Sequence, residues 1–472
     1  MGINHLTIQE QHELLKKKEI KPSQLVDECA KAYEESKDLN AYLEFFEDAK
    51  DRAAQLDGQE PQDHPLWAIP GAIKDNIAMK DRKMTCASKI LEKFVSPYDA
   101  TVIKRLQNAE FINLGRLNHD EFAIGASGFY SAFGPTLNPL DRQRFPGGSS
   151  SGSAVAVAAG LASFALGTDT GGSCRLPASY CGVYGFKPTY GTIPRDGVAE
   201  YAPSLDTVGI LARCPLDIDY VYQQISGKDI MDESSRDPQE YFCSCDKEVS
   251  LKGLKVAVFR RLLERCRPAV QQAFQQAYDV LKSEGAEFKD VELDVEDILL
   301  NTYYVTACSE ASSSLSRYDG ARYGMCLDAQ GKTMEQLYAQ TRTSGFGHEV
   351  QRRILLGNFF LAEQNYQQWY AKALSIRQHL ADRSEQLAKE GFCTYLLPGF
   401  NEAQKIDASE EDTYSSDLVG VFANLMGVPA LALPLSSGRH GLPVSFQLSG
   451  ARGSDRRVLG IGQQLYLRLK KS

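Results

Sequence analysis

Hydrophobic and polar positions change their period along the chain, and each period predicts a different kind of element. Residues 7 to 57 carry charges between apolar positions at helical spacing, with Thr7 and Glu10 in the spacing of a capping box. From Ser153 to Leu166, alanine and valine recur without proline. This pattern predicts a mostly solvated helical layer at the N-terminus and, later in the chain, a buried helix that packs through small side chains.

In the second half of the chain, short apolar runs flank a helical pattern. Leu254 to Arg260 and Phe288 to Leu293 have the length of strands, and Pro268 to Glu284 between them carries its apolar residues on one face. This order predicts a parallel pair of strands with a right-handed crossover, and Gly285 is expected to close the helix. Residues 330 to 390 are again helical in pattern.

Three further apolar runs, at residues 394 to 398, 430 to 435 and 444 to 448, have the pattern of buried strands. Predicted strands therefore lie on both sides of the helical stretch. This favours an α/β fold with one mixed sheet that both halves of the chain supply, rather than two separable domains. The acidic run from Asp407 to Asp412 is expected to be a surface loop.

Composition excludes some classes of protein. The 472 residues include 61 acidic and 52 basic side chains, a formal net charge of −9, and 43 % of the residues are hydrophobic. These values are ordinary for a globular protein and exclude a disordered or fibrous chain. The acidic balance argues against nucleic-acid binding through the chain's own charge. It leaves open RNA binding through a partner.

Neither a membrane segment nor a disulfide framework is expected. The run from Ser153 to Leu166 is the longest stretch of small and apolar residues, and it is too short to cross a bilayer. The first residues lack the apolar core of a secretory signal. The 11 cysteines are odd in number and scattered. We therefore expect a cytoplasmic protein or one of an organellar matrix, with no membrane as partner.

Two glycine-rich turns carry the most specific chemical signal. Gly147-Gly148-Ser149 and Gly171-Gly172-Ser173 repeat one pattern, and glycine pairs allow tight turns in which backbone N–H groups converge on one point. Such a turn suits an oxyanion or a phosphate. A phosphate loop normally carries a lysine beside the turn, and neither turn has one. The two serines are therefore the better candidates for chemistry.

A serine nucleophile needs a base, because its hydroxyl is weakly nucleophilic at neutral pH. Among the seven histidines only His119 and His348 stand in suggestive contexts, and neither matches a triad signature. The alternative is serine–lysine chemistry, in which burial lowers the pKa of a lysine toward neutrality. Lys74, in the apolar segment IPGAIKDNI, is the candidate base.

These segments resemble the amidase signature family of serine hydrolases, which use a Ser–cis-Ser–Lys triad. The resemblance runs from Ile69 to Gly450 and rests on the KDN, GGSSSG and DTGGSCR segments. It implies that Ser173 is the nucleophile, that Ser149 follows a cis peptide and relays protons, and that Lys74 is the base. The backbone N–H groups of the residues beside Ser173 would form the oxyanion hole: Thr170, Gly171 and Gly172.

The same resemblance implies a fold and a domain organisation. The amidase-signature fold is one large mixed β-sheet covered by helices on both faces. Residues 1–472 would form a single domain with an N-terminal helical layer at 1–60 and a catalytic core at 61–225. Residues 226–472 would complete the same sheet.

A second set of segments narrows the resemblance to the A subunits of tRNA-dependent amidotransferases, which are glutaminases. These segments are NHDEF, SAFGPTLNP, YYVTACSEASSSLSRYDGARYG, HEVQRRILLGNF and NLMGVPALALP. The resemblance implies that Arg353 holds the α-carboxylate of glutamine, a task for a planar bidentate group. Asp417 would hold the α-ammonium group and Tyr304 would line the pocket, although the neighbouring Tyr303 is the alternative for that place.

Partners and cofactors follow from the same resemblance. Ammonia from glutamine would pass to a tRNA-binding, ATP-using B subunit, with a small C subunit completing the complex, and convert Glu-tRNA(Gln), Asp-tRNA(Asn) or both. ATP and Mg²⁺ would belong to the partner, and tRNA would be bound only through it. No metal or organic cofactor is expected in this chain, since the Cys243 and Cys245 pair has no second pair at metal-ligand spacing.

Some positions depart from the family's usual pattern, and two other functions stay open. The departures are His119, residues 127 to 130, Leu176 and residues 195 to 201. A free-standing amidase for small or aryl amides would share the triad, and a non-catalytic scaffold would share only the fold. Cys174 and Cys181 are interpreted as small buried hydrophobic residues rather than nucleophiles.

Overall fold

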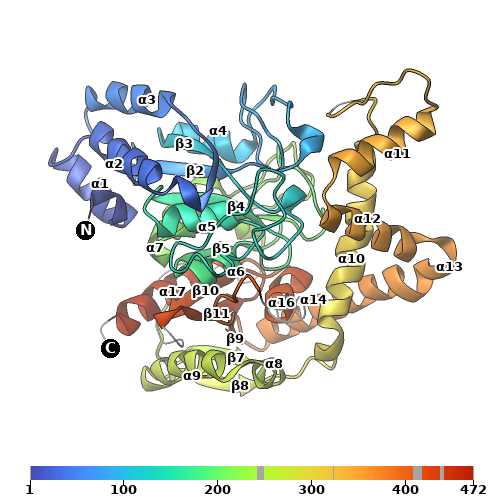
Figure 1. The fold of residues 1–472 in the computed structure, drawn as a ribbon. Coiled ribbons are helices and arrows are strands. Elements are labelled where there is room, and N and C mark those ends of the chain that lie inside the picture. The colour runs from blue at the N-terminus through green and yellow to red at the C-terminus, as the bar shows by residue number, and fades with distance from the viewer. Residues whose placement is uncertain (1, 242–248, 323, 408–416, 436–440, 471–472) are drawn as a thin grey trace.

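One mixed β-sheet runs through the protein (Figure 1). The computed structural model describes residues 2–241, 249–322, 324–407, 417–435 and 441–470. Within these ranges eleven strands follow the order β1-β3-β2-β4-β6-β5-β10-β11-β9-β7-β8. The strands are β1 Tyr42–Phe45, β2 Pro70–Lys74, β3 Ile112–Leu117, β4 Phe164–Asp169, β5 Tyr184–Lys187, β6 Thr207–Ala212, β7 Lys255–Val258, β8 Glu287–Asp290, β9 Thr394–Pro398, β10 Ala430–Leu435 and β11 Val444–Gly450.

Both halves of the chain supply this sheet, which confirms the prediction of one mixed sheet. The halves meet where β5 pairs antiparallel with β10, with Phe186 opposite Leu431. Strand β2 lies parallel to both β3 and β4, so it has a partner on each side. The predicted parallel pair is present as β7 and β8, with Val256 opposite Phe288.

Most helices pack against the sheet, and a separate group of helices lies to one side of it. They are α1 Ile8–Lys16, α2 Pro22–Glu35, α3 Asp48–Asp57, α4 Thr101–Asn108, α5 Ser151–Ala158, α6 Arg175–Cys181, α7 Pro215–Ile225, α8 Arg260–Glu264, α9 Pro268–Ser283, α10 Leu299–Ser314, α11 Met334–Gly345, α12 His348–Leu361, α13 Glu363–Tyr366, α14 Lys372–Lys389, α16 Asp417–Met426 and α17 Asp455–Leu469. The capping box of Thr7 and Glu10 at the start of α1 is present as predicted.

The sheet is covered by helices on both faces, as predicted. Successive residues of a strand point to opposite faces, and β10 shows what lies on each. Leu431 reaches the place where a side chain on Gly462 of α17 would stand. The next residue, Ala432, packs with Leu176 and Tyr180 of α6. Helices α6 and α17 therefore lie on opposite faces, with α5 beside α6 and α7 beside α17.

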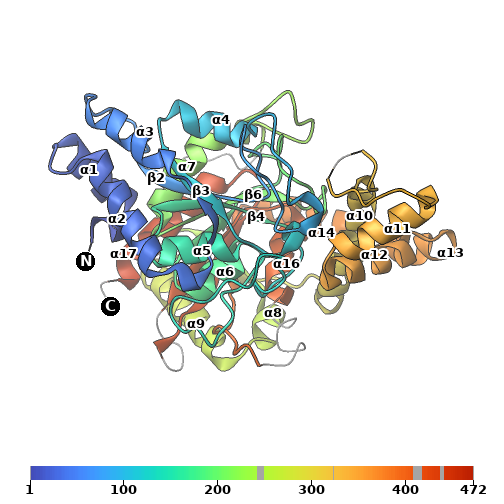
Figure 2. The same cartoon turned by 45° about the horizontal axis from the view of Figure 1, so that its top comes forward.

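Helices α10 to α13 extend to one side of the sheet in both views (Figures 1 and 2). Helix α10 packs along α12, and it also contacts α16 and α14. Residues 330 to 390 are helical over most of their length, as predicted. Helix α10 carries Tyr303 and Tyr304, and helix α12 carries Arg353, the residues named above for the substrate site.

Two sequence predictions were wrong in part. The helix predicted from Ser153 to Leu166 ends at Ala158, and strand β4 begins at Phe164. Gly160 has a φ of +73°, which breaks the helix, and the buried run that follows is apolar in either conformation. The N-terminal layer also contains strand β1, which forms an edge of the sheet beside β3.

Two other predictions meet the limits of the described residues. Asp407 is exposed, and the rest of the acidic run lies outside those residues, as do Cys243 and Cys245. Across the described ranges, every helix is too short or too polar to span a membrane.

Candidate active site

Lys74 ends strand β2 at the centre of the sheet. All five residues of β2 are buried, and the Lys74 side chain is 0 % exposed. Its Nζ donates to three hydroxyl oxygens, at 2.8 Å from Ser149 Oγ, 3.1 Å from Ser150 Oγ and 2.9 Å from Thr168 Oγ1. Burial removes water from the ammonium form and lowers the pKa of Lys74 to about 8. A lysine with this pKa can act as a base near neutral pH.

Ser149 joins Lys74 to the turn that precedes α5. The Gly148–Ser149 peptide bond is cis, and the Ser149 carbonyl accepts a hydrogen bond from the Asp120 N–H at 3.1 Å. Within the described residues, Lys74 is the only hydrogen-bond partner of the Ser149 hydroxyl. The structure thus brings two of the three predicted triad residues into direct contact.

Ser173 lies in the turn between β4 and α6, on the wall of a cavity. Its carbonyl accepts a hydrogen bond from the Ser150 N–H at 3.0 Å, which ties this turn to the turn that carries Ser149. The residue is 8 % exposed, and its hydroxyl has no hydrogen-bond partner among the described residues. Ser173 therefore presents an open hydroxyl to the cavity.

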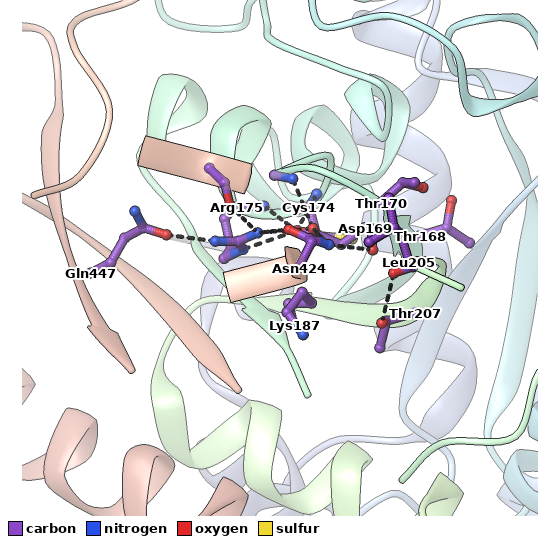
Figure 3. A network of polar contacts seen from close by, with 12 residues as sticks. Thr168, Asp169, Thr170, Cys174, Arg175, Lys187, Leu205, Thr207, Asn424 and Gln447 are labelled. Atoms are coloured by element: carbon purple, nitrogen blue, oxygen red, sulfur yellow. Dashed lines mark hydrogen bonds and ion pairs between the residues drawn. The ribbon is translucent and has the colours of Figure 1, made fainter. Parts of the chain in front are cut away.

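The ion pair of Asp169 and Arg175 holds the turn that carries Ser173, and Figure 3 shows these two side chains with Asn424 and Gln447. Both side chains are fully buried, with Nη2 of Arg175 at 3.0 Å from Oδ1 of Asp169. The same carboxylate accepts from the backbone N–H of Gly172 at 2.8 Å and of Cys174 at 3.1 Å. Burial alone would raise the pKa of the Asp169 carboxyl, but Arg175 holds it well below its usual range. The carboxylate stays charged and fixes the turn on both sides of Ser173.

Residues from the far half of the sheet complete this network. Arg175 also donates to Gln447 Oε1 on β11 at 2.7 Å and to Asn424 Oδ1 on α16 at 2.7 Å. Asn424 in turn donates to the Asp169 carbonyl and carboxylate at 3.0 Å. The turn that carries Ser173 is therefore anchored to both halves of the chain.

The predicted oxyanion donors differ in what they contact. The Gly172 N–H already donates to the Asp169 carboxylate, so in this structure it is not free to bind an oxyanion. The backbone N–H groups of Thr170, Gly171 and Ser173 donate to no described residue. The Thr170 hydroxyl donates to Asp206 Oδ1 at 2.6 Å, which fixes the start of the turn.

The cavity beside Ser173 has a volume of about 270 Å³. Its wall combines the glycine turns of the site with aromatic and aliphatic side chains and one buried ion pair. The lining residues are Gly125, Ala126, Ser127, Phe129, Tyr130, Phe145, Gly148, Gly171, Gly172, Ser173, Leu176, Tyr201, Tyr303, Glu349, Arg353 and Ile406. Five of the positions named above as departures from the family pattern are among them: Ser127, Phe129, Tyr130, Leu176 and Tyr201.

Arg353 of α12 lies on the cavity wall, as the sequence predicted. Its Nε is paired with Glu349 Oε1 at 2.7 Å, one helical turn earlier, and its guanidinium lies over the Tyr304 ring at 4.5 Å. Nη1 is 3.4 Å from the Tyr201 hydroxyl, and Nη2 has no hydrogen-bond partner among the described residues. The Cys308 side chain also lies beside the guanidinium. Glu349 and Tyr201 thus hold the arginine, and Nη2 is the nitrogen left for an anion.

The two other predicted substrate residues have different outcomes. Tyr303, the alternative that the sequence left open, lines the cavity, whereas Tyr304 supports Arg353 from outside it. Successive residues of helix α10 point in different directions, and of this pair only Tyr303 is among the residues that line the cavity. Asp417 begins α16, and its side chain lies outside the described residues.

Sequence reasoning missed several residues that hold the site. Asp169 and Arg175 flank Ser173 in the DTGGSCR segment, and a charged pair around a glycine turn is a signal that could have been used. Asn76 is the last residue of the KDN segment, and Thr168 directly precedes the DTGGSCR segment, but the resemblance assigns a role to neither residue. Glu349 precedes Arg353 by four residues, the spacing of a helical ion pair.

The histidines and cysteines near the site are not placed for catalysis. His119 is buried, its Nδ1 lies 2.7 Å from the Asp120 carbonyl, and burial lowers its pKa well below the usual value. Cys174 and Cys181 are buried, as predicted, and burial raises the pKa of the Cys174 thiol to about 12. Among the described residues, no three histidine, cysteine or acidic side chains form a group that could hold a metal ion.

Comparison with known proteins gives the same family along nearly the whole chain. Residues 24–459 match the family model described as Amidase. The chain is 40 % identical over 481 aligned residues to the A subunit of glutamyl-tRNA(Gln) amidotransferase from Treponema denticola, covering 98 % of each chain. The crystal structure of the A subunit of the same name from Thermotoga maritima is similar at a TM-score of 0.79, with 33 % identity and coverage of 98 % of this chain and 94 % of that one.

Native peptide amidase from Stenotrophomonas maltophilia is also similar in structure, with a TM-score of 0.80, 28 % identity and coverage of 98 % of this chain and 97 % of that one. The fold is therefore shared by proteins that are named for different activities. The family model and the relatives give the family that the segments with Lys74, Ser149 and Ser173 resemble. The mixed sheet is the fold of that family. This chain belongs to the amidase family.

Proposed function

We propose that this chain is the glutamine-hydrolysing A subunit of a tRNA-dependent amidotransferase. The observation that carries the proposal is one cavity that both Ser173 and the buried Arg353 line. Relatives about 40 % identical over nearly their full length, each named as the A subunit of glutamyl-tRNA(Gln) amidotransferase, support it.

Glutamine fits this cavity with its two ends on different residues. Arg353 binds the α-carboxylate through Nη2, since Glu349 occupies Nε and the Tyr201 hydroxyl lies 3.4 Å from Nη1. Asp417 binds the α-ammonium group, as the family resemblance implies. Tyr303 lines the space between the ends, and Tyr304 keeps Arg353 in place from outside. The carboxamide then lies at Ser173.

Acylation uses the three triad residues in sequence. Ser173 Oγ bonds to the carboxamide carbon while its proton passes to Ser149 Oγ and the Ser149 proton passes to Lys74 Nζ. Backbone N–H groups of Thr170 and Gly171 stabilise the oxyanion that forms on the carbonyl oxygen. The carbon–nitrogen bond then breaks, and the nitrogen takes a proton back along the same path and leaves as ammonia. A γ-glutamyl ester remains on Ser173.

Deacylation repeats these proton transfers with water. Water adds to the ester carbon and gives a proton to the relay, and Ser173 Oγ leaves with a proton from it. Glutamate is released. The ammonia passes to a B subunit that binds tRNA and uses ATP and Mg²⁺ to activate Glu-tRNA(Gln), Asp-tRNA(Asn) or both, with a small C subunit in the complex. This chain itself needs no cofactor for glutamine hydrolysis.

Replacing Ser173 by alanine separates glutamine hydrolysis from transamidation. In the complex purified with its partner proteins, Ser173→Ala should lower glutamine-dependent transamidation at least about 1,000-fold, because it removes the nucleophile. Transamidation with added ammonium should stay near the wild-type rate. The measurement is formation of amidated tRNA with each nitrogen donor.

The matched control is Ser179→Ala, which removes a buried hydroxyl on α6 that has no hydrogen-bond partner among the described residues. It should leave both activities near wild type. Glutamine-dependent activity that survives Ser173→Ala would show that the nucleophile is another residue.

The pKa of Lys74 predicts the pH dependence of acylation. Only the neutral amine accepts a proton, and burial lowers its pKa to about 8, so the neutral fraction rises with pH up to that value. Single-turnover glutamine hydrolysis should therefore increase about tenfold per pH unit below pH 8 and level off above it. A rate that is flat across this range would contradict Lys74 as the base.

Arg353 is expected to act on binding rather than on the chemical step. Arg353→Ala should raise the KM for glutamine about 10- to 100-fold, the loss of one charge-assisted contact, with a smaller change in kcat. Arg352→Ala is the matched control, since Arg352 pairs with the same Glu349 from the more exposed side. An unchanged KM in Arg353→Ala, or an equal rise in Arg352→Ala, would overturn this role.

A free-standing amidase is the second candidate, favoured by the apolar side of the cavity wall. Phe129, Phe145, Leu176 and Ile406 give Ser173 neighbours that suit an apolar acyl group or leaving group. This function would be assigned if the purified chain hydrolysed an aryl amide but not glutamine and no partner proteins co-purified with it.

A further inference from the structure

Lys74 contacts three hydroxyl groups, one more than a neutral amine can donate hydrogen bonds to. A protonated lysine donates three hydrogen bonds, so it can satisfy Ser149, Ser150 and Thr168 together. A neutral lysine has two N–H groups and one lone pair. One of the three hydroxyls must then donate to Lys74, and only a donation from Ser149 carries the proton of the reaction.

The Ser150 hydroxyl has another place for its proton. Its Oγ lies 3.1 Å from the Thr168 carbonyl oxygen, to which it donates. Ser150 therefore accepts from Lys74 and does not compete for the lone pair. The Ser149 hydroxyl, by contrast, has only Lys74 as a partner within the described residues.

The Thr168 hydroxyl is the remaining competitor, and Asn76 decides where its proton goes. Thr168 Oγ1 lies 3.1 Å from Nδ2 of Asn76, while Oδ1 of Asn76 is buried without a hydrogen-bond partner among the described residues. With the nitrogen facing Thr168, the hydroxyl proton has no acceptor in the described chain except the Lys74 lone pair. A half-turn of the amide exchanges its oxygen and nitrogen, which are nearly equal in size, and brings Oδ1 to Thr168.

We propose that Asn76 and Thr168 are positioning residues for the general base: Asn76 Oδ1 accepts the Thr168 hydroxyl proton, and this directs the lone pair of Lys74 to Ser149. Asn76 is 1 % and Thr168 2 % exposed, so both contacts are shielded from bulk solvent. The inference rests on the proposed amide hydrolysis, because it assigns a task to two residues of the same proton path.

This arrangement satisfies every hydroxyl proton in both states of the lysine. When Lys74 is neutral, it donates to Ser150 and Thr168 and accepts from Ser149. When Lys74 is protonated, it donates to all three hydroxyls, and the Thr168 hydroxyl still donates its hydrogen bond to Asn76 Oδ1. With the opposite amide orientation the Thr168 proton has no acceptor once Lys74 is charged. The proton can therefore move between Ser149 and Lys74 without any other hydroxyl turning.

The test measures the reactivity of Ser173 without relying on glutamine. A fluorophosphonate forms a bond from phosphorus to Ser173 Oγ and expels fluoride, while the serine proton follows the same path to Lys74. Thr168→Val keeps the side-chain shape and removes the hydroxyl. We expect labelling of Ser173 to slow about 10- to 100-fold at its pH plateau, the range of a misdirected general base. Thr168→Ser should restore the rate to within about threefold.

The pH profile distinguishes positioning from a structural defect. Thr168→Val removes one acceptor of the charged lysine, so the pKa of Lys74 should fall and the ascending limb of the profile should move to lower pH. The variant would then be slower although more of its lysine is neutral. Thr207→Val, which removes a buried hydroxyl on the neighbouring strand β6, is the matched control and should keep the wild-type rate and profile.

Asn76→Leu supplies a second, independent arm. Asn76 is proposed to act through Thr168, so Asn76→Leu should slow labelling in the wild-type background and change it by less than about twofold in the Thr168→Val background. Additive losses of labelling rate in the double variant would overturn the inference, as would a wild-type labelling rate in Thr168→Val. It would also be overturned if Thr168→Val labels slowly with an unshifted pH profile and Thr168→Ser does not restore the rate. A wild-type chain whose Ser173 does not label would overturn the proposed function as well.

Discussion

The burial of one lysine amine among hydroxyl groups is the constraint on which the site depends. Lys74 ends a strand with neighbours on both sides, and its side chain has no exposure to water. Burial lowers its pKa to about 8, which corresponds to a cost on the order of 3 kcal/mol while both folded and unfolded lysine are protonated. That cost falls as the pH rises above 8, because the folded protein then holds the neutral form. The hydroxyls of Ser149, Ser150 and Thr168 take the place of water around the amine.

A buried ion pair fixes the turn that carries Ser173, the proposed nucleophile. The Asp169 carboxylate binds backbone N–H groups on both sides of Ser173, and Arg175 fixes that carboxylate to Gln447 and Asn424. A buried charge pair of this kind adds little to stability but is costly to break. Its contribution here is geometric, since it joins the turn of Ser173 to strands and helices from the other half of the chain.

Much of the architecture could be predicted from the sequence, because the second-half strands stand out as short apolar runs bounded by helical patterns. Strand β4 could not, since a buried run of small apolar residues after α5 fits a helix or a strand equally well. The proposed triad comes from the resemblance of the KDN, GGSSSG and DTGGSCR segments to the amidase signature family. The choice between Tyr303 and Tyr304 depends on the rotation of α10, and contacts such as Arg175 with Gln447 join residues far apart in sequence, so no local pattern reveals them.

The covalent state of Ser173 during turnover tests the central claim most directly. Trypsin cleavage after Arg144 and Arg175 gives one peptide that contains Ser149, Ser173 and Cys174. After acid quenching with glutamine, tandem mass spectrometry of this peptide should find a γ-glutamyl group on Ser173, and none when glutamine is omitted. A γ-glutamyl group on Ser149 or Cys174, or glutamine turnover without any covalent adduct, would contradict the account.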